Sequence, residues 1–405
     1  MSIPSDFFGV LTELDSFSRN KVRIPTLGVD TANPYDVTIL PLTEAKLALN
    51  TLSLGGLVTT TTSASFANVG CIESLIDQIY IEFGGISVMP SFTYYNHVWM
   101  MLSDLQGTWN KAGLRTILNL QKTSNTAPSA NQTAVPFQLN QFLGFLKDIK
   151  MLDLARCPPA KIYIKWASPA VLVNTATTTG ASYQLTKLYA TVDVLGLSPA
   201  YDALIDAKLS QGAISYPFTN FTSIPGGTGT LTQTTRWSTS ANALEKIYGT
   251  FLSTTFNTQN AQADTVTYQS PYFNRGTTNL STNLTSRFNV NGMPFPPAPA
   301  DETRREVLLQ TMQTICEDHD LTSAQHPALN SQTNWATKFW VHGVNFVWDD
   351  PQALTRVSGI SGLGNQLLGT WESVSTQTDS CLPFIFLQHR SVLQLSANRN
   401  IRYIH

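Results

Sequence analysis

Short runs in which apolar and polar residues alternate recur along most of the chain. They are rich in β-branched and aromatic residues and are bounded by Gly, Pro, Asn and Thr, a pattern typical of half-buried β-strands. Nine such runs predict strands at 22–29, 35–42, 46–54, 76–83, 161–166, 183–195, 338–348, 383–388 and 391–404. Because regular helices do not separate them, this strand density indicates β-sandwiches or barrels and argues against a parallel α/β sheet.

Helical spacing of apolar residues is confined to a few segments, which are 94–105, 140–152 and 301–316. The first 18 residues show similar spacing and predict an amphipathic N-terminal arm. The polar face of this arm lacks Lys and Arg, which favours docking on the protein or a partner over a membrane surface. Thr-, Ser- and Asn-rich stretches predict long surface loops at 121–136, 220–240 and 254–285.

One predicted element occurs twice in the chain. The runs IEFGGISVMP (81–90) and FNVNGMPFPP (288–297) lie 207 positions apart. In both, an apolar alternation reaches a dipeptide that tolerates positive φ, as a two-residue hairpin turn requires. These dipeptides are Gly84-Gly85 and Asn291-Gly292. A short return strand, a proline and a helix in the same register follow each turn, which predicts two similar domains in tandem.

The sequence resembles the double jelly-roll major capsid proteins of adenovirus hexons, tectivirus coats, virophages and large DNA viruses. Three stretches carry the resemblance: CIESLIDQIYIEFGGISVMPSFTYYNHVWMML (71–102), FLKDIKMLDLARCPPAKIYIKWASPAVLV (145–173) with the strand after it, and RFNVNGMPFPP (287–297) with its helix. The resemblance implies an all-β fold of two tandem eight-stranded jelly-roll β-sandwiches with a few short helices and long surface loops. The expected divisions are an N-terminal arm at 1–20, a first roll at 21–205 and a second roll at 206–405.

A function and partners follow from the same resemblance. Three chains would form a pseudo-hexagonal homotrimer, and trimers would build an icosahedral virus shell. Neighbouring capsomers and penton or minor capsid proteins would be partners, and residues 1–20 would lie at the inner side, where an internal membrane is a candidate partner. The protein would be found in the virion capsid after assembly inside the host cell, and it would not be an enzyme.

Composition agrees with subunits that cover one another. Charged residues make up 13% of the chain and the net charge is −2, whereas an ordinary soluble protein has roughly 25% charged residues. The sequence has no cluster of Lys and Arg of the kind that neutralises phosphates, so direct binding of nucleic acid is not expected. The cysteines are far apart without a C-x-x-C pair, and buried free thiols are favoured over zinc sites or disulfides. They are Cys71, Cys157, Cys316 and Cys381.

Four patterns invite a chemical interpretation, and each has a favoured structural one. Gly84-Gly85 lacks the spacing and the lysine of a phosphate-binding loop, so a hairpin turn is favoured. Residues 316–326, CEDHDLTSAQH, include metal-ligand types but follow a predicted helix end, where polar residues gather. Asp349 and Asp350 are adjacent before a proline, which favours a turn over a general acid and base pair. His97 predicts a helix-surface or interface histidine. No catalytic, cofactor or metal site is therefore expected.

Two other functions remain open from the sequence. Tryptophans among polar loops suit a carbohydrate-binding or glycan-hydrolysing β-sandwich protein, and they are Trp109, Trp237, Trp335 and Trp340. A surface adhesin is the other candidate, weakened by an N-terminal segment that lacks the features of a secretory signal.

Overall fold

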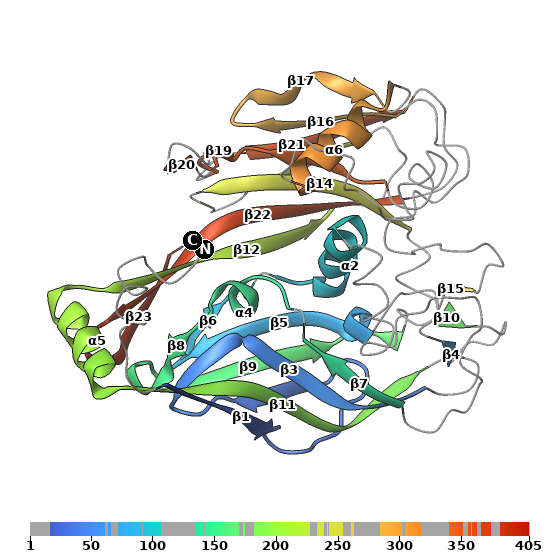
Figure 1. The fold of residues 1–405 in the computed structure, drawn as a ribbon. Helices are drawn as coiled ribbons and strands as arrows, with labels where there is room; N and C mark the ends of the chain where they lie inside the picture. The colour runs from blue at the N-terminus through green and yellow to red at the C-terminus, as the bar shows by residue number, and fades with distance from the viewer. Residues whose placement is uncertain are drawn as a thin grey trace.

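The computed structural model describes residues 17–60, 64–65, 72–90, 92–106, 135–140, 142–169, 173–174, 182–226, 233–238, 241, 243–253, 261–262, 284–301, 304–316, 340–350, 355–357, 359–362, 366–373 and 381–404. Strands dominate these ranges, and the helices are few and short (Figure 1). The strands before residue 198 are β1 (Phe17–Pro25), β2 (Val37–Pro41), β3 (Lys46–Thr60), β4 (Ala64–Ser65), β5 (Ile76–Phe83), β6 (Ile86–Val88), β7 (Val135–Leu139), β8 (Leu152–Asp153), β9 (Ala160–Trp166), β10 (Val173–Asn174) and β11 (Tyr183–Leu197).

The strands after residue 213 are β12 (Ile214–Pro225), β13 (Gln233–Ser238), β14 (Leu244–Ser253), β15 (Ala261–Gln262), β16 (Leu284–Val290), β17 (Met293–Asp301), β18 (His342–Asn345), β19 (Trp348–Asp350), β20 (Thr355–Val357), β21 (Gln366–Ser373), β22 (Cys381–Ser396) and β23 (Asn400–Ile404). The helices are α2 (Tyr95–Gln106), α4 (Phe145–Asp148), α5 (Pro199–Gln211) and α6 (Glu306–Cys316), with 3-10 turns η1 (Ile72–Leu75), η2 (Leu154–Arg156) and η7 (Ala397–Arg399).

The two halves of the chain order their sheets identically. The first half forms sheets β1-β11-β3-β7 and β2-β9-β5-β6, and the second forms β12-β22-β14-β18 and β13-β21-β16-β17. When the strands of these paths are numbered within each half in chain order, both halves have the orders 1-8-3-6 and 2-7-4-5. Two four-stranded sheets in each half make an eight-stranded jelly roll. This arrangement confirms the all-β fold expected from the sequence.

Alternating burial explains why each sheet pair closes into a sandwich. In β9, Ala160, Ile162, Ile164 and Trp166 are buried, while the lysines and the tyrosine between them are partly exposed. Successive side chains of a strand point to opposite faces, so this alternation places one apolar face of the sheet inside the roll. The strand β5 alternates in the same way, and it has the bounds expected from the sequence.

The remaining short strands and the helices complete the architecture. The strand β8 pairs with β3, β23 pairs with β22, and β19 pairs with β20. The strands β15, β10 and β4 form a small three-stranded sheet that joins segments of both halves. The helix α5 connects the last strand of the first roll to the first strand of the second roll, and α2 and α6 each follow the hairpin of their own roll.

Several elements differ from the sequence prediction. Residues 17–20, expected at the end of the N-terminal arm, lie in β1, which pairs with β11 from Phe17 onward; residues 1–16 are outside the described ranges. The helix expected over 140–152 is the single turn α4, since Gly144 before it has φ 68° and ψ −137°. The helix expected from Asp301 begins at Glu306, because Asp301 is still paired with Thr285 in the β16–β17 ladder.

Other differences concern strands and connections. The segment 338–348 contains β18 and the start of β19, and 383–388 with 391–396 is the single strand β22. The predicted loop 220–240 holds the end of β12 and all of β13. The predicted loop 121–136 lies almost wholly, and 254–285 for the most part, outside the described ranges. The helix α5 was not predicted, and the expected boundary at 205/206 falls inside it.

Candidate functional site: the junction of the two rolls and the exposed edges

The two rolls meet through one continuous hydrophobic core, which we call the junction. Aromatic side chains of the first roll pack directly on those of the second. The ring pairs are Phe92 with Phe221 (centroids 5.1 Å apart), Phe145 with Phe218 (5.0 Å) and Tyr94 with Phe384 (4.9 Å). Leu393, Leu395 and Ile401 of the second roll belong to the same buried cluster. Large aromatic surfaces buried on both sides hold the two rolls in one fixed relation.

Hydrogen bonds between the two rolls also cross the junction. The backbone N–H of Thr219 in β12 donates to Asp148 Oδ2 of α4 at 2.7 Å. The Ser223 hydroxyl, also in β12, donates to the carbonyl oxygen of Thr93. The strand β12 therefore pairs with β22 on one side and bonds to the first roll as well.

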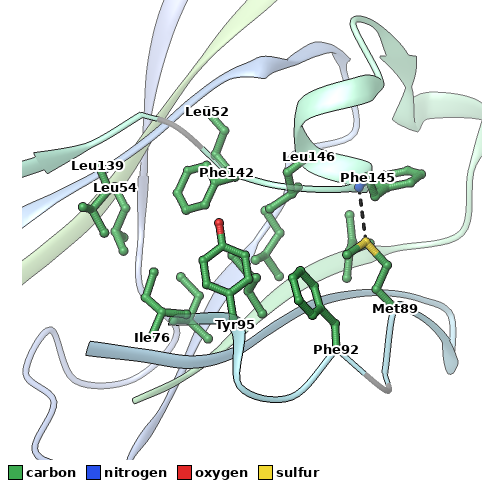
Figure 2. Close-up of a cluster of buried hydrophobic side chains, with 14 of the residues drawn as sticks. Leu52, Leu54, Ile76, Met89, Phe92, Tyr95, Leu139, Phe142, Phe145 and Leu146 are labelled. Atoms are coloured by element: carbon green, nitrogen blue, oxygen red, sulfur yellow. Dashed lines mark hydrogen bonds between the residues drawn. The ribbon is translucent and has the colours of Figure 1, made fainter. Parts of the chain in front are cut away.

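The first-roll side of the junction is built around Met89 (Figure 2). Its sulfur accepts the backbone N–H of Phe145 at 3.2 Å, and the phenol of Tyr95 accepts the N–H of Leu143 at 3.1 Å. These two bonds join the segment after β6 to the segment that contains α4. In Figure 2 Phe92, Tyr95, Phe142 and Phe145 gather in this space, so Met89 and Phe92, which lie between β6 and α2, belong to the core.

An ionic cluster holds α5 against the first roll. The Arg156 guanidinium bonds to Asp202 at 3.0 Å and Asp206 at 2.8 Å on α5, and to Asp153 beside it at 2.5 Å. Lys46 Nζ of β3 lies 2.9 Å from Asp202 Oδ1. The hydrogen bond that Arg156 donates to Asp206, together with the bonds to the other carboxylates, raises the Arg156 pKa against the opposing effect of burial.

The pKa values of the two α5 carboxylates in this cluster are lowered in turn. Burial alone would raise the pKa of Asp202, but the hydrogen bonds from Lys46 and Arg156 outweigh it and lower that pKa. The hydrogen bond from Arg156 lowers the pKa of Asp206 in the same way. Beneath the cluster, Tyr201, Ile205 and Ile214 form a small buried group of their own. The connection between the rolls is thus fixed by charge and by apolar packing.

The two predicted hairpin turns have matching geometry. Gly84 and Gly85 have φ of 54° and 94°, and Asn291 and Gly292 have φ of 56° and 82°. In the first hairpin Phe83 pairs with Ile86 and Ile81 with Val88. In the second, Val290 pairs with Met293 and Phe288 with Phe295. These pairs are related by the same 207-residue shift that relates the sequences. Both turns lie at the surface, where positive φ at two successive residues suits a type I′ hairpin.

The structure also places His97, Cys157 and the pair Asp349 and Asp350, which the sequence analysis considered. His97 is 4% exposed, with its ring near Tyr94 and Phe384, so its expected place on the helix surface is wrong. Its side chain faces the junction because α2 is packed between the rolls. Asp349 and Asp350 end β19 and pair with Arg356 and Thr355 of β20, so the two aspartates lie in a strand and not in the expected turn. Cys157 is a buried free thiol, and burial raises its pKa to about 12.

The tryptophans that motivated a glycan-binding function are not surface platforms where the structure describes them. Trp237 and Trp340 are 6% and 0% exposed, and Trp340 stacks on Phe251. Trp109, Trp335, Cys71 and residues 317–326 lie outside the described ranges. Among the described residues, no group of three or more His, Cys, Asp or Glu side chains could hold a metal ion, and no helix there is both long and apolar enough to cross a bilayer.

The sequence analysis missed the ionic cluster at α5. The dipeptide Ser198-Pro199 was the available signal, since Pro is favoured in the first turn of a helix, and here it occupies that position. The sequence also did not reveal that four of the seven exposed large hydrophobic residues in the described ranges are exposed, because all four lie within the predicted strands 22–29 and 35–42; they are Leu27, Val29, Tyr35 and Val37.

No family model matches the sequence, and no curated protein matches it either. Solved structures do match over nearly the whole chain. PBCV-1 VP54, in a crystal structure fitted into a reconstruction of the virophage Sputnik, is 14% identical with a TM-score of 0.66, covering 96% of this chain and 97% of its own. The Faustovirus major capsid protein is 9% identical, with a TM-score of 0.60 and coverage of 94% and 91%.

The Sputnik virophage structure determined by cryo-EM is also similar, with 8% identity, a TM-score of 0.56, and coverage of 96% of this chain and 88% of that one. At such identities the likeness concerns the fold, which spans both halves in each comparison. The chain therefore has the double jelly-roll fold of viral major capsid proteins, as the identical strand orders of its two halves require.

Proposed function

We propose that this chain is a viral major capsid protein, three copies of which form a pseudo-hexagonal capsomer of an icosahedral shell. The observation that carries the proposal is the pair of identically ordered jelly rolls joined by one shared core. One chain then supplies two similar lobes in a fixed relation, and three chains around a three-fold axis supply six. The match in fold to the Faustovirus major capsid protein supports the same role.

The proposed domains are a first roll at 21–205 and a second roll at 206–405, which arose by duplication. The common register of the Gly84-Gly85 and Asn291-Gly292 hairpins supports this division. In this proposal the four turn residues serve the fold of each roll and take no part in binding. The role is structural, and assembly by burial of apolar surface takes the place of catalysis.

The partners proposed are further copies of the chain, neighbouring capsomers, and penton or minor capsid proteins, within a virion assembled in the host cell. An internal membrane reached by residues 1–20 is a further proposed partner, and direct contact with nucleic acid is not part of the proposal. A glycan-binding function is not favoured, since Trp237 and Trp340 are buried.

Purified protein tests the proposal directly. Sedimentation velocity is expected to give the mass of a trimer, and negative-stain images are expected to show six-sided particles. A compact monomer at all concentrations would contradict the capsomer, whatever the fold. Binding to an oligosaccharide array by a monomeric protein would favour the glycan-binding alternative.

A further inference from the structure

The two hairpin turns are held to the rest of their rolls by different chemical groups. In the first roll, the backbone N–H of Gly84 donates to the carbonyl oxygen of Pro159 at 3.0 Å. In the second roll, the side-chain Nδ2 of Asn291 donates to the carbonyl oxygen of Ser361 at 2.9 Å. A backbone donor is part of the chain itself, whereas the donor of an asparagine side chain belongs to an amide that water can hydrolyse.

The Asn291 hydrogen bond connects the two sheets of the second roll. Ser361 belongs to the segment 359–362, in which Ile360 exchanges two backbone hydrogen bonds with Leu244 of β14, at 2.8 and 3.0 Å. The hairpin of β16 and β17 lies in one sheet and β14 lies in the other, and Figure 1 shows them as different layers. The carboxamide of Asn291 therefore links the tip of one sheet to a segment that is bonded to the opposite sheet.

The peptide nitrogen that follows Asn291 is accessible. Asn291 and Gly292 are both exposed. Among the described residues other than its two neighbours in the chain, no heavy atom lies within 4 Å of the place a Cβ of Gly292 would take. The ladder closes with the pair Val290–Met293, so the two turn residues lie outside it. Because glycine has no side chain, nothing on Gly292 shields its nitrogen from the side chain of Asn291. This is the only Asn-Gly dipeptide in the sequence.

We propose that Asn291 is a site of spontaneous deamidation, with water as the only co-reactant. The backbone nitrogen of Gly292 attacks Cγ of Asn291, and the new N–C bond closes a succinimide ring. The Cγ–Nδ2 bond breaks, and Nδ2 leaves as ammonia with the proton that the backbone nitrogen has lost. Water then opens either imide C–N bond and leaves aspartate or isoaspartate at position 291. No oxidant or reductant takes part, and asparagine is among the thermally labile residues of proteins.

The fold slows this reaction without preventing it. The Asn291 backbone has φ of 56°, and its Nδ2 is engaged with Ser361. The carboxamide must therefore leave its hydrogen bond before Cγ meets the nitrogen of Gly292. Exposed turns open locally at a lower free energy than core strands do, so the folded chain reaches this geometry, though less often than the unfolded chain. The inference is independent of the proposed function, because it depends on the turn alone.

Deamidation removes the connection between the sheets. Either product replaces the Nδ2 donor by a carboxylate, which only accepts hydrogen bonds and cannot bond to the carbonyl oxygen of Ser361. Isoaspartate also adds a carbon atom to the backbone of a two-residue turn, and the geometry of such a turn depends on its length. The hairpin then loses its contact with the segment 359–362, and the N–H of Ile360 exchanges more readily with water.

Peptide mass spectrometry of the full chain, incubated in mildly alkaline buffer, follows conversion at each asparagine. Asn345 is the matched internal reference, because it is exposed in the same roll and its Oδ1 accepts the N–H of Val347 at 3.0 Å, but Phe346 follows it. Asn291 is expected to convert severalfold faster than Asn345, and faster still in the chain unfolded by urea. Equal rates at Asn291 and Asn345 would overturn the proposal, as would an Asn291 that stays intact while the unfolded chain converts.

The variant Asn291→Gly tests the structural consequence, because it gives the second turn the Gly-Gly sequence of the first and leaves no amide to hydrolyse. Hydrogen exchange at Ile360 and thermal melting are measured before and after the incubation. In the unchanged protein, exchange is expected to become faster and the melting temperature to fall, whereas both are expected to stay constant in Asn291→Gly. Asn291→Asp is expected to show faster exchange without incubation. Conversion of Asn291 with unchanged exchange at Ile360 would overturn the role of the amide in joining the sheets.

Discussion

Gly144 lies directly against Met89 at the junction of the rolls. A Cβ on Gly144 would come within 2.4 Å of Met89 Cε and 2.7 Å of its sulfur, and 3.1 Å from the carbonyl oxygen of Thr219 in the second roll. Gly144 has φ of 68° and Met89 has φ of 64°, so both backbones are in the left-handed region. Three segments from the two rolls thus meet where there is no room for a side chain.

Replacing Gly144 with alanine is expected to destabilise the protein by about 1–3 kcal/mol, from strain at positive φ and overpacking against Met89. Chemical denaturation monitored by tryptophan fluorescence measures the change. Gly212→Ala is the matched control, because no heavy atom of the described residues lies within 4 Å of the place its methyl group would take. Equal midpoints for Gly144→Ala and the control would show that the junction tolerates the added carbon.

At Gly85 and Gly292 in the hairpin turns, the backbone conformation favours glycine, and a lack of space does not. Among the described residues, no heavy atom lies within 4 Å of a Cβ at Gly85 or Gly292, whose φ values are 94° and 82°. Gly85→Val and Gly292→Val are therefore expected to cost about 1–3 kcal/mol each through backbone strain alone, and to lower the yield of soluble trimer. Gly85→Asn is expected to cost less, because Asn tolerates this region. Identical melting of the valine variants and the parent would contradict the turn assignment.

Arg156→Met is expected to destabilise the α5 connection by about 2–4 kcal/mol at neutral pH, because it leaves the 2%-exposed Asp153 carboxylate without its guanidinium partner. Arg399→Met is the control, since Arg399 and Glu44 form an exposed pair at 3.5 Å, and such pairs contribute about 0–1 kcal/mol. Similar loss of stability in both variants would argue against the ionic cluster as the anchor of α5.

The same cluster predicts sensitivity to acid. Hydrogen bonds lower the pKa of Asp202 and Asp206 in the folded chain from the ordinary 3.8. Their stabilisation is therefore complete above about pH 4 and is lost as the pH falls through the lowered values. Melting temperatures measured from pH 6 to pH 2 are expected to fall less steeply in Arg156→Met than in the parent below pH 4. Parallel profiles would exclude a contribution of these carboxylates.

His97 predicts a second pH dependence in a higher window. Burial lowers its pKa from 6.5 to about 3. Between these pH values the His97 side chain is therefore protonated in the unfolded chain and neutral in the folded chain. Stability is expected to fall as the pH drops below about 6.5, by up to about 1.4 kcal/mol per pH unit for this histidine. His97→Gln is expected to remove that part of the slope in urea unfolding at pH 7, 6 and 5. His342, with the same lowered pKa, keeps its own contribution and serves as the internal reference.

Strand positions were largely predictable because their signal is local. Alternating burial in β5 and β9 follows directly from the alternation of apolar residues in 76–83 and 161–166. The position of α2 likewise follows from apolar spacing within twelve residues. In contrast, α5 buries only Tyr201 and Ile205, so its apolar pattern was too sparse to predict a helix, and its anchor on Arg156 joins residues about fifty positions apart.

The sequence by itself determined the class of the fold, since strand periodicity and turn chemistry act over a few residues and the repeated hairpin reveals two similar units. Only the tertiary structure decided how the units are joined. The stacking of Phe92 on Phe221, the burial of His97 and the approach of Gly144 to Thr219 link positions far apart in the chain. Such contacts depend on the packing of whole sheets, and no local pattern specifies them.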